Sequence, residues 1–227
     1  GKGPAQTAVM PESAVAALAS ASFRSDRIEP LAKRTVIVVT NNCIFTEEDI
    51  VKTFNNGKNA SVPKIIPGAL PSLLKLAQTT NLHLITQFPH SSHDDLTPFI
   101  EARVVPSKRS VHGEWAIDAP EKKILKALDK AGVFAAGMHN TRQCLFCEST
   151  DGRGFIARTV SENADSGPLA LHVDDRTESV EWLQNVLSNT TVVGIRTLQN
   201  NGKFSRPKRG EPAEVVGSLA EYFEEQK

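Results

Sequence analysis

Six consecutive residues, Thr35 to Thr40, all carry side chains that branch at the β-carbon. Such residues favour extended backbone, and an unbroken run of them is typical of a strand buried on both faces. Strands of that kind occur in parallel sheets whose two faces are covered by helices. We therefore expect a central parallel strand at the start of the ordered domain, near residue 34.

Downstream of this run, short apolar stretches alternate with segments of helical periodicity. The stretches predict strands at Leu82–Thr86, Cys144–Cys147, Leu169–Asp174 and Thr191–Ile195. Helices are predicted from Thr46, around Leu70–Ala77, from Pro120 to Ala131 with Gly132 as the stop, from Ser149 to Val160, from Thr177 to Leu187 and from Pro212 to Glu225. Alternating strands and helices are usually joined as parallel neighbours by right-handed crossovers. The predicted fold class is α/β, a Rossmann-like open, mostly parallel sheet with helices on both faces.

Three segments define the expected domain organisation. Residues 1–33 are rich in Ala, Ser and Pro with only patchy helical periodicity, so we expect a flexible N-terminal lead-in. Residues 34–227 are predicted to form a single Rossmann-like domain, a length sufficient for one well-buried core. Within that domain, residues 88–118 mix Pro, His, Ser and basic side chains, and we expect them to form a surface insertion.

The composition argues against several classes of partner. Lys+Arg and Asp+Glu both number 26, so the chain has no overall electric field to draw it onto nucleic acid or an anionic membrane. No stretch of 18 consecutive apolar residues, the length that spans a bilayer, is present. The three cysteines do not make a disulfide framework, which indicates a reducing compartment.

One glycine pattern suggests a dinucleotide site. Gly152-Arg153-Gly154-Phe155-Ile156-Ala157 fits the G-x-G-x-x-A fingerprint between a predicted strand and helix, and Asp174 follows about 20 residues later, where a ribose-binding carboxylate would stand. The fingerprint normally lies in the first strand–helix–strand unit of its domain, however, and two predicted strands precede it here. We therefore keep a dinucleotide-binding, oxidoreductase-like domain, with Gly152, Gly154 and Asp174 as its cofactor residues, only as an alternative.

A second alternative is a degenerate phosphatase of the haloacid-dehalogenase type. The first strand leads into Thr40-Asn41-Asn42, and a later strand ends in Asp174-Asp175, as in that fold. The reaction needs an aspartate nucleophile at the end of the first strand and a second carboxylate two residues on. Thr40 and Asn42 occupy those two positions, so the resemblance is architectural only.

Other catalytic or metal-binding patterns are also incomplete. Cys144 and Cys147 are three residues apart on a predicted strand, so their thiols should point to opposite faces of the sheet. No GxSxG elbow, P-loop or cysteine with an assignable base occurs. We therefore expect no catalytic residues, no cofactor and no metal, and interpret the chain as a domain that holds another protein.

Three neighbouring segments carry a family resemblance. They are Lys123 to Gly137, which contains Ala-Gly-Val-Phe, then Cys144-Leu-Phe-Cys-Glu-Ser-Thr150, and Phe155-Ile-Ala-Arg158. Together they resemble the helix end and the strand–turn–helix of the cytosolic domain of plant-type peroxisome biogenesis protein 22. Because residues 88–118 and Gly154 depart from that family's pattern, the chain is similar to a divergent member.

The resemblance implies both a function and a location. Members of the family have a Rossmann-like fold without enzymatic activity, fixed to the cytosolic face of the peroxisome membrane by an N-terminal segment. There the domain recruits and stimulates the ubiquitin-conjugating enzyme that modifies the import receptor for recycling. The resemblance therefore implies a protein partner, no nucleic acid, and membrane contact only through an N-terminal anchor that this chain lacks.

The predicted last helix offers a surface for that partner. Val216, Leu219, Ala220 and Phe223 share one apolar face at helical spacing, with Val215 and Tyr222 beside it. Tyr222 is the only tyrosine, and an aromatic side chain at the edge of such a face either anchors an interface or extends the core. The candidate partner-binding residues are Val215, Leu219, Tyr222 and Phe223.

Overall fold

A parallel sheet forms the centre of the molecule. The computed structural model describes residues 9–56, 60–89, 120–138, 141–163, 167–204 and 212–225. Within these ranges the sheet has six strands: β1 (Thr35–Val39), β2 (Asn81–Gln87), β3 (Cys144–Cys147), β4 (Leu171–Asp174), β5 (Thr191–Ile195) and β6 (Glu214–Val216). Their order is β3-β2-β1-β4-β5-β6, and each neighbouring pair is parallel. The predicted α/β, Rossmann-like fold class is confirmed.

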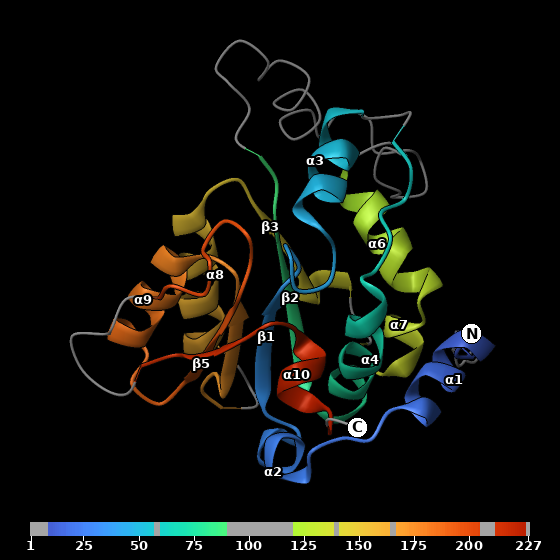
Figure 1. Cartoon of the computed structure of the whole chain (residues 1–227), viewed down its shortest axis with the longest axis horizontal. Coiled ribbons are helices and arrows are strands. Elements are labelled where there is room, and N and C mark those ends of the chain that lie inside the picture. Colours follow the sequence, from blue (N-terminus) through green and yellow to red (C-terminus); the bar gives the residue numbers. More distant parts are fainter. Residues whose placement is uncertain are drawn as a thin grey trace, which may run out of the picture.

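Helices cover both faces of the sheet, as Figure 1 shows. One face carries α8 (Thr150–Asn163) and α9 (Thr177–Val186). The other carries α1 (Glu12–Ser20), α3 (Glu47–Asn55), α4 (Leu70–Thr79), α6 (Pro120–Lys130), α7 (Val133–Ala136) and α10 (Leu219–Phe223). Across the described ranges, no helix combines the length and apolarity needed to cross a bilayer.

The β-branched run forms the central strand and contributes to both cores. Every residue of β1 is buried. Val36 and Val38 pack into the core beneath α4 and α6, whereas Ile37 and Val39 pack beneath α8 and α9. Alternating side chains of a strand point to opposite faces of its sheet, so a strand covered on both sides needs apolar residues at every position.

The predicted helix boundaries are confirmed where local chemistry defines them. Thr46 caps α3, since its Oγ1 accepts a hydrogen bond from the Asp49 N–H at 3.1 Å. Helix α6 begins at Pro120 and is followed by Gly132, whose φ of 80° lies in the left-handed region. A side chain at Gly132 would also meet the ring of Pro11, with its Cβ 2.7 Å from the proline Cδ.

The expectation of a flexible lead-in is wrong for residues 9–33. These residues form α1, α2 (Ser25–Ile28) and a 3-10 turn, η1 (Glu29–Leu31), with Ala14 fully buried. The Lys33 N–H donates to the Thr79 carbonyl at 2.7 Å, which ties the segment to the end of α4. Helix α1 packs against α4 through small alanine side chains. These residues do not form a strong apolar stripe, so the hydrophobic periodicity of the segment is weak. Residues 1–8 lie outside the described ranges.

The expected helix from Pro212 to Glu225 is also wrong. The segment forms β6 and then the short helix α10, separated by Gly217 and Ser218. Val215 and Val216 suit extended backbone and pair with β5, while the Ser218 Oγ accepts from the Glu221 N–H at 3.1 Å and starts the helix there. The apolar face predicted along one helix is therefore divided between two elements.

The expectation that the surface insertion begins at residue 88 is wrong for Phe88. Phe88 is fully buried, and its ring stacks on those of Phe54 and Phe146 at 5.7 Å between centroids in both cases. Residue 88 therefore belongs to the core. Pro89 is half-buried, and residues 90–118 of the predicted insertion lie outside the residues that the structure describes.

Candidate functional site

The best place for a ligand in this topology is the carboxyl edge of the sheet between β1 and β4. Strand order reverses direction there, and open α/β sheets bind ligands at such switch points. The register pairs Val38 with Val173, so the residues that follow β1 and β4 leave the sheet side by side. The structure thereby brings together Thr40 and Asn42 with Asp174 and Asp175, the positions compared with phosphatase residues.

An arginine from α8 fills the space between the two aspartates. The Arg153 Nη1 lies 2.5 Å from Oδ1 of Asp174 and 2.6 Å from Oδ1 of Asp175. Arg153 and Asp174 are 0% exposed and Asp175 is 2% exposed. We call these three residues the buried ion cluster. Their charges are engaged with one another and not with solvent.

The role of Arg153 was missed in the sequence, where it occupied a variable position of the glycine fingerprint. One feature could have pointed to it. Two adjacent aspartates at the end of a buried strand need a cation, because buried charges are almost always paired. On α8, Arg153 and Ala157 are four residues apart and both fully buried, so they share the face that packs on the sheet.

Neutral side chains complete the site on the β1 side. The Asn42 Nδ2 donates to Oδ2 of Asp175 at 2.7 Å. The Thr40 hydroxyl is buried and donates to the Thr86 Oγ1, at the end of β2, at 2.8 Å. Thr40 and Asn42 therefore make structural hydrogen bonds at the positions where a phosphatase carries its two carboxylates.

Residues of α3 and of the β4–α9 connection cover the cluster from the solvent side. The Arg176 guanidinium forms an ion pair with the carboxylate of Glu47, and both side chains are about one-quarter exposed. The Arg176 N–H also donates to Oδ1 of Asp174 at 3.0 Å, and the Glu47 N–H donates to Oδ1 of Asn42 at 3.1 Å. These contacts close the edge of the sheet over the buried ion cluster.

Burial and pairing act in opposite directions on the two carboxylates. Burial alone would raise the pKa of Asp174, but the Arg153 charge and the contact with His172 outweigh it and hold that pKa well below its usual range. For Asp175, burial and the neighbouring Asp174 charge outweigh the Arg153 and Asn42 contacts, so its pKa is raised. The Arg153 pKa is raised despite its burial, because both aspartates favour its charged form.

The two fingerprint glycines serve packing inside the protein. Gly152 and Gly154 both lie within α8, which begins at Thr150, so neither forms the tight turn that a pyrophosphate requires. A Cβ on Gly152 would lie 3.0 Å from Cβ of Cys147, and one on Gly154 would lie 2.8 Å from the Trp182 ring. Because Asp174 is held by Arg153, the dinucleotide alternative loses both of its supports.

The thiols are buried and protonated. Cys144 packs into the core beneath α4 and Cys147 into the core beneath α8, so the prediction that they point to opposite faces is confirmed. Burial raises the pKa of Cys144 to about 12 and that of Cys147 to about 11. Burial, with the nearby Asp175 and Asp174 charges, also raises the Cys43 pKa. No group of three metal-ligating side chains occurs in the part of the chain that is described.

Comparison with known proteins does not assign the chain to a family. No family model matches the chain, and no curated protein is significantly similar to it. We therefore infer the function from the site, from the surface and from the resemblance of Lys123–Gly137, Cys144–Thr150 and Phe155–Arg158 to a known family.

The partner-binding residues expected on the last helix are unsuited to that role. Leu219 and Phe223 are fully buried, Tyr222 is 5% exposed and Val215 is half-buried in β6. The Tyr222 hydroxyl accepts from the Arg27 Nη1 at 3.2 Å, and the guanidinium stacks on its ring at 4.6 Å. Helix α2, within the expected lead-in, thus covers this face, and Tyr222 extends the core.

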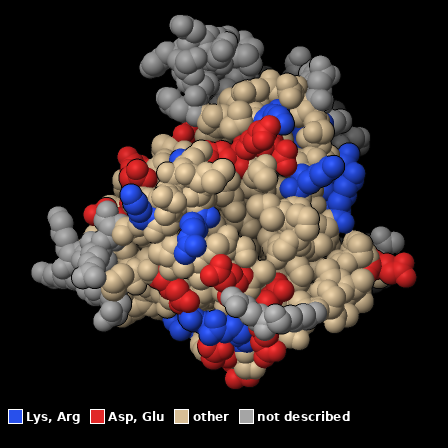
Figure 2. All heavy atoms as spheres, viewed as in Figure 1, with Lys and Arg blue, Asp and Glu red and all other residues tan. Residues whose placement is uncertain are grey.

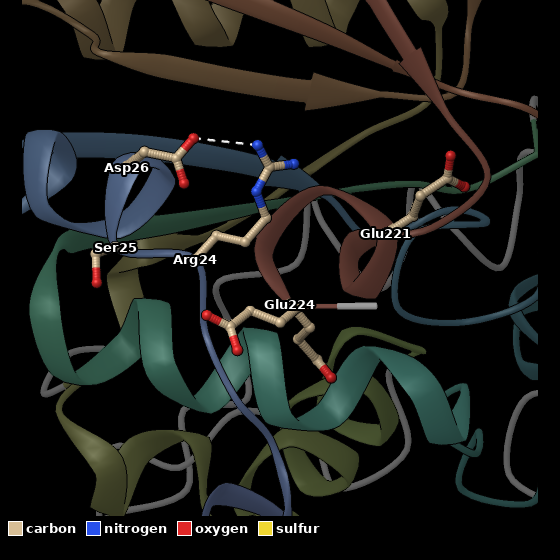
Figure 3. Close-up of a pocket in the computed structure, with 6 residues that line it drawn as sticks. Arg24, Ser25, Asp26, Glu221 and Glu224 are labelled. Carbon is tan, nitrogen blue, oxygen red and sulfur yellow. Dashed lines mark hydrogen bonds and ion pairs between the residues drawn. The ribbon is translucent and has the colours of Figure 1, made fainter. Parts of the chain in front are cut away.

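A shallow hollow lies beside that contact, between the start of α2 and α10 (Figure 3). It has a volume of about 530 Å³, and its charged lining is mostly acidic: Arg24, Ser25, Asp26, Glu221, Glu224 and Glu225. Arg24 pairs with Asp26 at 3.1 Å, and the Glu224 carboxylate accepts from the Ser72 hydroxyl at 2.7 Å. The first contact lies within the start of α2, and the second joins α4 to the end of α10. None of the residues that line the hollow is buried.

The visible face of the molecule carries charges of both signs. Figure 2 shows acidic and basic side chains in separate groups over this face, with a larger basic group over α6. The presence of both signs agrees with the balanced composition.

Proposed function

We propose that the chain is a non-catalytic binding domain. It recruits and activates a peroxisomal ubiquitin-conjugating enzyme at the cytosolic face of the peroxisome membrane, and so supports ubiquitination and recycling of the import receptor. The buried ion cluster carries the non-catalytic half of this proposal. At the switch point, where an enzyme of this fold binds its substrate, Arg153 already pairs with both aspartates, and Arg176 with Glu47 covers them.

The choice of partner is supported by the family resemblance. Its segments form most of α6 with α7, strand β3 and part of α8. Helices α6 and α7 contact each other on one face of the sheet, and β3 contacts α8 on the other. Val133, Cys144 and Cys147 within them are buried, so these residues support a shared core and not a shared binding surface. Phe155 differs, because it lies in the third segment and is 62% exposed.

A reconstituted assay tests the proposal. The peroxisomal ubiquitin-conjugating enzyme of the same organism is charged with ubiquitin, and its discharge to free lysine is followed with and without the purified chain. The expected result is retention of the enzyme on the immobilised chain together with faster discharge. Absence of both effects at micromolar concentrations would contradict the proposed function. A cytosolic ubiquitin-conjugating enzyme is the control for selectivity.

A further inference from the structure

An aromatic groove lies between α8 and α9. These two helices cover the face of the sheet opposite α1 and α10 (Figure 1). It has a volume of about 320 Å³. Its lining consists of two aromatic, two acidic and three small residues: Phe155, Trp182, Asp151, Glu178, Thr150, Gly154 and Ser179. The groove adjoins the buried ion cluster, because Ser179 lines the groove and also interacts with the Asp174 carboxylate. Arg153 lies on the face of α8 that packs on the sheet and does not line the groove.

The groove is formed by specific packing and has an exposed apolar wall. The ring centroids of Phe155 and Trp182 lie 5.8 Å apart and the ring planes are tilted by 59°, so the two rings are not stacked face to face. The Trp182 ring rests directly on α8 because Gly154 has no side chain. Phe155 is 62% exposed, and Trp182 beside it is partly exposed. Large apolar side chains exposed together at a concave site are typical of a binding surface.

The rim of the groove carries charge of one sign. Asp151 and Glu178, in the first turns of α8 and α9, are the charged residues among those that line it, and both are exposed. Neither carboxylate forms an ion pair with another described residue. Each helix N-terminus offsets about half a charge, so a net negative potential remains beside the two rings.

Aromatic faces and carboxylates together select one kind of side chain. A guanidinium stacks on a tryptophan ring through its flat face and pairs with carboxylates through its edge, which an aliphatic or acidic side chain cannot do. We propose that the groove between α8 and α9 is the docking site for a segment of a partner protein that inserts an arginine flanked by apolar residues. This inference rests on the proposed function as a protein-binding domain.

The groove is tested directly with a peptide probe. The full ¹⁵N-labelled chain is titrated with acetyl-Ala-Leu-Arg-Leu-Ala-amide and with the peptide in which citrulline, a neutral isostere, replaces arginine. The expected result is saturable shifts of the Trp182 indole N–H and of α8 and α9 amides, with affinity about fivefold lower for the citrulline peptide. Equal affinity for the two peptides, or no shifts localised to the groove, would overturn the proposal.

Variants separate the groove from the rest of the surface. Phe155→Ser and the double variant Asp151→Asn with Glu178→Gln should each lower the affinity of the chain for the arginine peptide about fivefold or more. The matched controls Val15→Ser and Glu12→Gln change an exposed apolar and an exposed acidic residue on α1, across the sheet, and should leave the affinity unchanged. Unfolding curves establish that each variant is folded.

The same variants distinguish this proposal from the proposed function. If the ubiquitin-conjugating enzyme binds the wild type and both controls but not the groove variants, both proposals are supported. If it binds all variants equally, the groove is overturned as the docking site while the proposed function stands. If it binds none while the arginine peptide still binds the groove, the proposed function fails alone. If the chain forms a dimer that dissociates in the Phe155→Ser variant, the groove binds a second copy of the chain. That result would overturn the proposal of a different partner protein.

Discussion

The guanidinium of Arg153 lies 2.5 Å from the carboxylate of Asp174, and neither side chain is exposed to solvent. Charges buried in this way are stable only while they remain paired, since each one alone would lose its hydration without compensation. The same nitrogen also reaches Asp175. Arg153 therefore occupies the space where a ligand would bind, and its pairing with the two aspartates stabilises the fold.

Replacing Arg153 should lower the free energy of unfolding far more than replacing an exposed arginine of the same helix. Arg153→Met leaves two carboxylates buried together, so we expect a loss of about 3–5 kcal/mol in the free energy of unfolding. The control is Arg158→Met, which breaks an exposed pair with Glu162 and should cost about 1 kcal/mol or less. Urea titrations of both variants measure the difference. Equal losses would show that the buried ion cluster does not hold the fold.

The Asp174 carboxylate should make stability depend on acid pH. Its pKa in the folded protein lies below the ordinary value of 3.8, so its contribution is fully present above that value and is lost as the pH falls toward the folded pKa. Asp175, whose pKa is raised, contributes with the opposite sign. The unfolding free energy of wild type minus that of Asp174→Asn should therefore shrink as the pH falls below about 4. Urea titrations from pH 3 to 7 test this, and a constant difference would contradict it.

The cysteines should resist alkylation in the native state. At pH 8 a thiol whose pKa is about 11 or about 12 is almost entirely protonated, and the thiolate is the reactive form. We expect no iodoacetamide adduct on Cys43, Cys144 or Cys147 within an hour, and three adducts in guanidinium chloride. Intact-mass spectrometry counts them. Rapid labelling of one cysteine in the folded chain would indicate an exposed, activated thiol.

Tyr222 should behave as a core residue. Tyr222→Ala removes a buried ring from between α2 and α10 and should lower the free energy of unfolding by about 3 kcal/mol. Because the ring faces the protein interior, partner affinity should be unchanged at temperatures where the variant is folded. Thermal unfolding and binding measured on one preparation separate the two effects. Weaker binding with normal stability would restore Tyr222 as an interface anchor.

The strands and most helices could be predicted because their determinants are local. The β-branched run of β1, the Thr46 cap and the Gly132 stop each act within a few residues of their own position. The division of the C-terminal segment into β6 and α10 could not be predicted so easily. Val216, Leu219 and Phe223 fit a helical period equally well, and pairing with β5 decides in favour of a strand.

The remaining features depend on contacts between residues distant in sequence. Arg27 meets Tyr222 across 195 positions, and Arg153 meets Asp174 across 21. Periodicity shows that a side chain is buried but not which partner it finds. The sequence therefore indicated where the site lies, through Thr40, Asn42 and the two aspartates, and missed the arginine that fills it.

Calorimetric titration of the peroxisomal ubiquitin-conjugating enzyme into the purified chain tests the central proposal most directly. A protein-binding domain should give a one-to-one complex with a dissociation constant in the micromolar range or tighter, which corresponds to about −8 kcal/mol or better. The Arg158→Met variant, which we expect to retain the fold, should bind like the wild type if α8 docks its partner through the groove alone. Absence of binding heat at several temperatures, with a folded chain and an active enzyme, would contradict the account.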